Sequence, residues 1–203
     1  MQTERNPYLE RMKSIAVYCG SSAGVNGVYS EQTRLLGQSL AHKNIKVVFG
    51  GGKVGLMGVL ADAVLEAGGD VTGVIPGFLD VKEVVHDGVT KMIQVETMHE
   101  RKALIDDMSD GAIALPGGFG TLDELFEMLT WGQLGLHQKP VGLLNTNRYY
   151  THILKAIGTM VKEGFLKKVN MEMVLVSEDI EELLEQMHRY RAPAVPKWIT
   201  KEG

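Results

Sequence analysis

Short apolar runs alternate with longer amphipathic segments along most of the chain. The apolar runs are continuous rather than alternating in polarity, as in SIAVYC (14–19), IKVVF (45–49) and GAIAL (111–115). Continuous runs of this length are typical of strands in a parallel sheet that is covered on both faces. Helix-like segments lie between them, for example over 29–43 and 55–68. This order predicts one Rossmann-like α/β domain, built on a doubly wound parallel sheet of about seven strands with right-handed crossovers.

The same patterns place the remaining elements and the domain boundaries. Further strands are expected over 70–75, 89–95, 140–144 and 173–176, and further helices over 97–108, 121–135, 149–163 and 178–190. The predicted organisation is a polar leader over 1–13, the Rossmann-like domain over 14–190 and a C-terminal tail over 191–203.

Composition narrows the class of protein. The chain has 203 residues, a formal net charge of −4 and one cysteine, Cys19. The acidic balance argues against binding the phosphate backbone of nucleic acid. No apolar run approaches the roughly 18 to 20 residues that span a bilayer, and the start of the chain has no apolar stretch of signal-peptide length. A lone cysteine fits a reducing compartment. We therefore expect a cytoplasmic protein with neither a nucleic-acid nor a membrane partner.

Glycine-rich loops follow three of the predicted strands. They are CGSS (19–22), FGGG (49–52) and LPGGFGT (115–121). In a doubly wound sheet the carboxyl ends of the parallel strands share one edge, where ligands bind. Glycine lets backbone N–H groups approach a ligand closely, and these groups together with a helix dipole form an anion site. The three loops predict a phosphorylated ligand, and the alternative is that they are only tight strand-to-helix turns.

Two nucleotide-binding templates fit the second loop poorly. Residues 50–55 match G-x-G-x-x-G between a strand and a helix, but the next strand ends at Pro76 with no acidic residue to hold a ribose diol. Dinucleotide binding is therefore disfavoured. The P-loop pattern fails because Lys53 is followed by Val54 rather than by Ser or Thr.

A hydrolase motif and metal-binding spacings have little support in the sequence. Residues 20–24 match the G-x-S-x-G nucleophile elbow, with Ser22 as the nucleophile and Asp179 and His188 as weak candidate partners. An esterase is therefore a minor alternative. The six histidines show neither H-x-x-x-H nor H-x-H spacing, so we expect no metal site and no cofactor.

Glu124 admits two interpretations. Thr121 and Glu124 fit the T-x-x-E capping box, in which the glutamate serves only to cap its helix, and Thr97 and Glu100 have the same spacing. If a phosphate instead occupies the N–H groups over 118–121, the Glu124 carboxylate is free to face the ligand.

Arg101 and Lys102 lie in the first turn of a predicted helix. Cations there oppose the helix dipole, at a cost of about 0.3–1 kcal/mol each. Placed at the carboxyl edge of the sheet, they indicate an anionic ligand nearby. The alternative is two solvated surface charges.

Two helices look too apolar for a monomer. In the helix over 121–135, a helical wheel places Leu122, Leu125, Phe126 and Leu129 toward the sheet and Glu124, Met128 and Trp131 on the opposite side. The helix over 56–67 is apolar nearly all round. Both features predict coverage by a second subunit in a symmetric homodimer, with Glu124 near the seam.

Five segments together resemble one known family. CGSS, FGGGKVGLMG, MHERK (98–102), PGGFGTLDE and LTWGQLG are similar to the LONELY GUY family of cytokinin-activating phosphoribohydrolases, over about residues 14–180. The resemblance implies hydrolysis of the N-glycosidic bond of a cytokinin or adenine nucleoside 5′-monophosphate, which releases the free base and ribose 5-phosphate. Members are often labelled lysine decarboxylase, but no lysine here sits in a recognisable pyridoxal phosphate context. A related group with a similar scaffold carries molybdenum cofactor, so a non-catalytic nucleotide or cofactor carrier is the alternative.

The resemblance also implies roles for particular residues. Arg101 and Glu124 would be the catalytic pair. Glu124 would orient water and stabilise positive charge at the anomeric carbon, and Arg101 would hold the phosphate or ribose and keep Glu124 ionised. The family commonly has Glu-Glu where this chain has Asp123-Glu124. Together with the loop argument, the resemblance places the following residues around the substrate: Ser21, Ser22, Gly51, Gly52, Glu83, Met98, Lys102, Gly117, Gly118, Phe119, Gly120, Thr121, Asp123 and Thr130.

Overall fold

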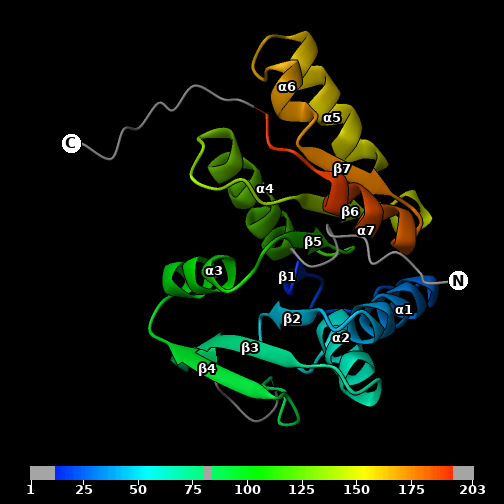
Figure 1. Cartoon of the computed structure of the whole chain (residues 1–203), viewed down its shortest axis with the longest axis vertical. Helices are drawn as coiled ribbons and strands as arrows, with labels where there is room; N and C mark the ends of the chain where they lie inside the picture. Colours follow the sequence, from blue (N-terminus) through cyan, green and yellow to red (C-terminus); the bar gives the residue numbers. More distant parts are fainter. Residues whose placement is uncertain (1–11, 80–83, 194–203) are drawn as a thin grey trace, which may run out of the picture.

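The apolar runs form one seven-stranded parallel sheet (Figure 1). The computed structural model describes residues 12–79 and 84–193. The strands lie in the order β4-β3-β2-β1-β5-β6-β7. Their bounds are β1 Ser14–Tyr18, β2 Lys46–Phe49, β3 Val71–Pro76, β4 Lys91–Val95, β5 Ala112–Ala114, β6 Val141–Leu144 and β7 Val174–Ser177. The predicted Rossmann-like class is confirmed.

Helices cover both faces of the sheet. One face packs against α1, α2 and α7, and the other against α3, α4 and α5 (Figure 1). Their bounds are α1 Val28–His42, α2 Gly55–Glu66, α3 Met98–Asp107, α4 Phe119–Gln133, α5 Thr151–Lys162, α6 Lys168–Met171 and α7 Ile180–Arg189. Two 3-10 turns, η1 Gly77–Leu79 and η2 Thr146–Arg148, follow the ends of β3 and β6.

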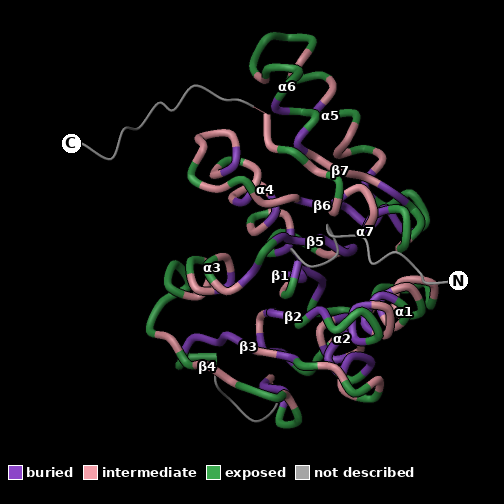
Figure 2. Tube along the Cα trace, viewed as in Figure 1, coloured by how far each residue is buried: buried purple, intermediate pink, exposed green. Residues whose placement is uncertain are grey.

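Strand β1 shows why the apolar runs are continuous. Ile15 and Val17 belong to the core under α1, α2 and α7, whereas Ala16 and Tyr18 belong to the core on the opposite face. Successive side chains point to opposite faces of a sheet, so a strand buried on both sides needs apolar residues at every position. Figure 2 shows this burial concentrated in the central strands.

Helix α2 is covered from within the chain. It packs against α1, where a Cβ on Gly37 would lie 3.0 Å from the Cβ of Ala63 and 3.1 Å from the carbonyl oxygen of Leu60. The small residues on both helices allow this close approach. Packing within the chain therefore accounts for much of its apolar surface, and the expectation that a second subunit covers this helix stays a prediction.

Helix α4 also differs from its predicted wheel. Met128 is only 2% exposed and packs in the core with Leu125, whereas Leu122, Phe126 and Leu129 are half-buried. The predicted exposed Met128–Trp131 pair is therefore wrong, because Met128 lies in the core and Trp131 is half-buried against it.

The strand order reverses beside β1, which pairs with β2 on one side and with β5 on the other. Connections leave in opposite directions at such a switch point, and a crevice opens at the carboxyl ends of the strands. No helix in the described ranges is both long and apolar enough to cross a membrane. Most of the predicted leader and tail lies outside the described residues.

Candidate active site

A cavity of about 430 Å³ lies at the switch point, within the usual range for small-molecule sites. The glycine loops after β1, β2 and β5 meet there, as the sequence predicts. Their lining residues include Gly20, Ser21, Gly50, Gly52 and the start of α4 over 118–121. One side of the cavity is apolar, and it is lined by Val54, Met57, Ile75, Leu79 and Val84. The cavity thus combines backbone amides with an apolar wall.

Arg101 and Glu124 meet inside this cavity. The Nη1 of Arg101 lies 3.4 Å from the Oε1 of Glu124, and each side chain is 12% exposed. Arg101 also donates from Nε to the carbonyl oxygen of Val74, at 3.1 Å. Its guanidinium lies against Gly50, where a Cβ would be only 1.8 Å from Nη2. Arg101 is therefore a largely buried, positioned cation, and the surface-charge alternative is wrong for it.

The capping-box interpretation of Glu124 is also wrong. Helix α4 begins at Phe119 with Gly118 as its N-cap, two residues before the predicted start, and no side chain caps it. Thr121 is buried inside the first turn, and the Glu124 carboxylate faces Arg101 instead. At the other candidate capping box, the Thr97 side chain does cap α3, because its hydroxyl accepts from the Glu100 N–H at 3.1 Å. Glu100 there accepts from the N–H of Glu96.

Close packing explains one glycine of the third loop, Gly117. A Cβ on Gly117 would lie 2.1 Å from the Oγ1 of Thr121 and 2.8 Å from the backbone N of Gly20. A side chain at this position would push the first and third loops apart. The absence of a side chain at Gly117 therefore lets the start of α4 lie next to the loop after β1.

Burial dominates the electrostatics of Glu124. Burial raises the pKa of its carboxyl to about 7, against the opposing effect of Arg101. The expectation that Arg101 keeps Glu124 ionised is therefore wrong in its net effect, because desolvation outweighs the pairing. A carboxyl with a pKa near 7 exchanges protons readily at neutral pH, which is the property a general acid or base needs.

Lys102 turns toward α4 rather than toward the cavity. Its Nζ lies 3.2 Å from an Asp123 carboxylate oxygen and 3.0 Å from one of Glu127. It is therefore not the solvated charge of the alternative interpretation. Lys102 and Asp123 do not line the cavity, and their substrate contacts stay predictions.

Three other predicted residues, Met98, Thr130 and Gly51, do not line this cavity. Met98 is exposed at the start of α3, and the hydroxyl of Thr130 donates to the carbonyl oxygen of Phe126 at 2.7 Å. Gly51 lies within its loop but does not line the cavity. Glu83 lies outside the described residues. The predicted ligand contacts of all four stay predictions.

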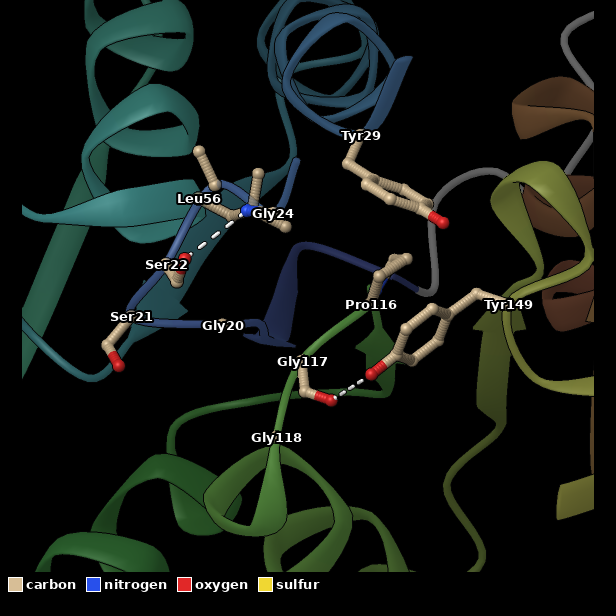
Figure 3. A pocket seen from close by; sticks show the side chains of 11 residues that line it. Gly20, Ser21, Ser22, Gly24, Tyr29, Leu56, Pro116, Gly117, Gly118 and Tyr149 are labelled. Atoms are coloured by element: carbon tan, nitrogen blue, oxygen red, sulfur yellow. Dashed lines mark hydrogen bonds between the residues drawn. The ribbon is translucent and has the colours of Figure 1, made fainter. Parts of the chain in front are cut away.

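A second cavity, of about 300 Å³, adjoins the first and shares Gly20, Ser21 and Gly118 with it (Figure 3). The side chains of Tyr29 and Tyr149 form one wall of this cavity, and Leu56 and Pro116 also line it. Ser22 lies here, where its Oγ accepts from the N–H of Gly24 at 3.3 Å.

This arrangement does not support an esterase triad. The chain runs on from Ser22 to Val28 before α1 begins, so Ser22 is not on a sharp strand-to-helix turn. Asp179 accepts from the N–H of Glu182 as the N-cap of α7, and His188 lines a different cavity with Lys43. In the described ranges, no cluster of three or more His, Cys, Asp or Glu residues could hold a metal ion.

Several residues of the site escaped the sequence analysis. The sequence marks Gly50 only as part of its loop, whereas the structure shows that it makes room for Arg101. Tyr149, which lines the second cavity, donates to the carbonyl oxygen of Gly117 in the third loop. A usable signal existed for Tyr149, because the loop after β6 also follows a strand end at this edge.

A segment beyond η1 also closes on the second loop. The N–H of Lys53 donates to the carbonyl oxygen of Val84 at 2.7 Å, and the N–H of His86 donates to that of Gly51 at 2.9 Å. His86 is in turn tied to α2 through Asp62, with its Nε2 3.0 Å from Oδ1. Neither pattern nor spacing indicated this segment.

Fold and site together define a doubly wound α/β protein in which glycine loops and a buried arginine–carboxylate pair meet at the switch point. Solved structures share the fold. The molybdenum cofactor binding protein of Rippkaea orientalis matches 90% of this chain and 96% of its own, with a TM-score of 0.65 and 23% identity. The molybdenum cofactor carrier protein of Chlamydomonas reinhardtii matches 87% of this chain and 98% of its own, with a TM-score of 0.67 and 23% identity. At this identity the likeness concerns the fold alone.

Sequence comparison is more specific. A family model described as "Possible lysine decarboxylase" matches residues 57–187. A cytokinin riboside 5′-monophosphate phosphoribohydrolase of Rhodococcoides fascians is 45% identical over 170 residues, which cover 83% of this chain and 86% of the relative. Another, LOG5 of Arabidopsis thaliana, is 44% identical over 181 residues, which cover 89% of this chain and 79% of the relative. The chain therefore belongs to the family of cytokinin riboside 5′-monophosphate phosphoribohydrolases.

Proposed function

We propose that this protein hydrolyses the N-glycosidic bond of a cytokinin or adenine nucleoside 5′-monophosphate, releasing the free base and ribose 5-phosphate. The observation that carries the proposal is the buried Arg101–Glu124 pair, which shares one cavity with the N-terminus of α4. A helix N-terminus offers unpaired N–H groups and a positive dipole end, so it binds phosphate without a charged side chain. The relatives named above carry this activity in their names.

The substrate would lie across the cavity. Its phosphate would accept from the amides of 118–121, and its base would rest against the apolar wall that includes Val54 and Met57. The anomeric carbon would then face Glu124. Phosphate binding supplies positioning, so a nucleoside that lacks the phosphate should react poorly.

Glu124 would act as the base. In its ionised form it would take a proton from water as the water oxygen attacks C1′ and the bond to the base nitrogen breaks. The transition state has oxocarbenium character, which a carboxylate stabilises. Because the pKa of Glu124 is about 7, the same carboxyl can then pass that proton to the departing base. Arg101 would hold the phosphate or ribose.

The family description and this chemistry point in different directions. Decarboxylation of an amino acid with pyridoxal phosphate needs a lysine that forms a Schiff base with the cofactor. Among the described residues that line the cavity there is no lysine. The nearby Lys102 forms ion pairs with Asp123 and Glu127. The residues of the site therefore fit hydrolysis better.

Incubation of the purified protein with AMP tests the proposal. We expect release of adenine and ribose 5-phosphate, a loss of about 10²-fold or more in Glu124→Gln, and a strong loss in Arg101→Ala. Glu127→Gln, one helical turn further along α4, is the matched control and should stay active. Tight AMP binding without turnover would identify a carrier instead. A comparison of AMP with isopentenyl-AMP would define the preferred base.

We also propose that the protein is a homodimer. Val95, Leu104 and Trp131 are half-buried and line a shallow groove on the outer side of α3 and α4. A symmetric contact would bury this groove in both copies. It would bring the seam close to the helix that carries Glu124.

A further inference from the structure

Tyr149 contacts the third glycine loop directly. Its hydroxyl donates to the carbonyl oxygen of Gly117 at 2.6 Å (Figure 3). That carbonyl belongs to the same peptide group as the N–H of Gly118, which is the N-cap of α4 and lines both cavities. A hydrogen bond accepted by a peptide carbonyl fixes the plane of the peptide and polarises it, which makes its N–H a stronger donor.

The turn that places Tyr149 has strained backbone angles. Asn147 and Arg148, the two residues before it, both have positive φ, of 51° and 58°. This left-handed region is uncommon for residues other than glycine, and such strain concentrates at functional sites. Edge-to-face contacts with Tyr29 and Tyr150, at centroid distances of 5.9 and 5.1 Å, hold the ring. The strained turn and the two rings together aim the hydroxyl at the loop.

Tyr150 provides a natural comparison. Its hydroxyl donates to the carbonyl oxygen of Leu115 at 2.5 Å, and its side chain is fully buried. Leu115 is followed by Pro116, which has no backbone N–H. The peptide that Tyr150 polarises therefore has no donor to offer a ligand. The two neighbouring tyrosines therefore make the same kind of bond to the same loop, but only Tyr149 acts on a peptide whose N–H belongs to a residue lining both cavities.

We propose that Tyr149 is a positioning residue for the substrate phosphate. By donating to Gly117 it orients the Gly117–Gly118 peptide and strengthens the Gly118 N–H as a donor to the phosphate. This inference rests on the proposed function for the identity of the ligand. The role of Tyr149 is to improve binding of any 5-phosphorylated ribose, before and during reaction alike.

The test compares Tyr149→Phe with Tyr150→Phe in the full chain. Calorimetry with ribose 5-phosphate should show affinity roughly three- to tenfold weaker in Tyr149→Phe, the range expected for one hydrogen bond. Tyr150→Phe should bind as the wild type does, although its melting temperature falls. With AMP, Tyr149→Phe should raise KM by a similar factor and leave kcat within about twofold, because the lost contact serves substrate and transition state equally.

Three outcomes would overturn the inference. They are unchanged ribose 5-phosphate affinity in Tyr149→Phe, equal weakening in Tyr150→Phe, and no ribose 5-phosphate binding by the wild type. The proposed function fails separately, if the wild type binds ribose 5-phosphate but releases no base from AMP. In that case the calorimetric comparison of the two variants still decides the role of Tyr149.

Discussion

The guanidinium of Arg101 lies 3.4 Å from the carboxylate of Glu124, and only about an eighth of either side chain is exposed. The two residues come from different helices, α3 and α4, which lie on the same face of the sheet. A buried charge is costly unless it is paired and hydrogen-bonded. The carbonyl of Val74 and the carboxylate of Glu124 meet that need for Arg101, and the missing side chain of Gly50 leaves room for its guanidinium. Burial raises the pKa of Glu124 to about 7.

The first prediction concerns the pH dependence of activity. With the pKa of Glu124 at about 7 and the ionised form acting as base, kcat/KM for AMP should rise with pH and level off above about pH 7. The residual activity of Glu124→Gln should not show this rise. A pH–rate profile of both proteins is the measurement, and a wild-type profile that is flat between pH 5 and 8 would contradict the assignment.

The second prediction follows from the same shift and concerns stability. A carboxyl whose folded pKa is raised above its unfolded value favours folding when protonated, and this contribution is lost as pH rises toward the folded pKa. Between about pH 4.5 and 7 the wild type should therefore lose up to roughly 3 kcal/mol relative to Glu124→Gln. Urea unfolding of both proteins across this range tests the sign. A wild type that gains stability over Glu124→Gln with rising pH would refute it.

The third prediction concerns Gly50. A methyl group there would occupy the space of the Arg101 guanidinium, so Gly50→Ala should displace it and reduce kcat by roughly tenfold to a hundredfold. Gly158→Ala is the control, because a Cβ at Gly158 in α5 meets nothing within 4 Å. It should keep full activity and gain stability, by up to about 1 kcal/mol. Adenine release and thermal melting measure both effects, and an active Gly50→Ala would show that Arg101 need not lie there.

The fourth prediction concerns the strained turn before Tyr149. Arg148→Gly should stabilise the protein by about 0.5–1 kcal/mol, because glycine adopts positive φ without a steric penalty. The exposed Arg148–Glu178 ion pair, at 3.5 Å, is worth little. Arg148→Ala also removes that pair but keeps the strain, so it should not stabilise. Chemical denaturation of the two variants separates these effects, and equal stability of both would mean that the turn stores no strain.

The fifth prediction concerns the oligomeric state. Trp131→Glu places a charge in the groove on α3 and α4, so it should convert the proposed dimer to a monomer. Asp107→Asn, in the same groove, is the milder control and should remain dimeric. Light scattering coupled to gel filtration gives the mass of each. A monomeric wild type at micromolar concentration would rule out the proposal.

Local pattern was sufficient for the order of strands and helices, for the glycine loops and for Arg101 and Glu124 as candidates. Each of these depends on residues close together in the chain: apolar runs such as 14–19, loops at strand ends, and charges at helix starts. The resemblance to a known family added the chemistry. Thr121 is the better cap by local rules, so the pattern starts α4 two residues late. In the structure Gly118 is the N-cap, and Thr121 lies close to Gly117 inside the first turn.

Tertiary structure alone decided the rest, because it depends on contacts between residues distant in sequence. Gly50 adjoins Arg101, and Tyr149 reaches Gly117 across 32 positions of the chain. Burial of Glu124, and hence its pKa, arises only when several elements close around it. A sequence specifies which side chains are available at one edge of a sheet, but their distances, orientations and desolvation are properties of the packed molecule.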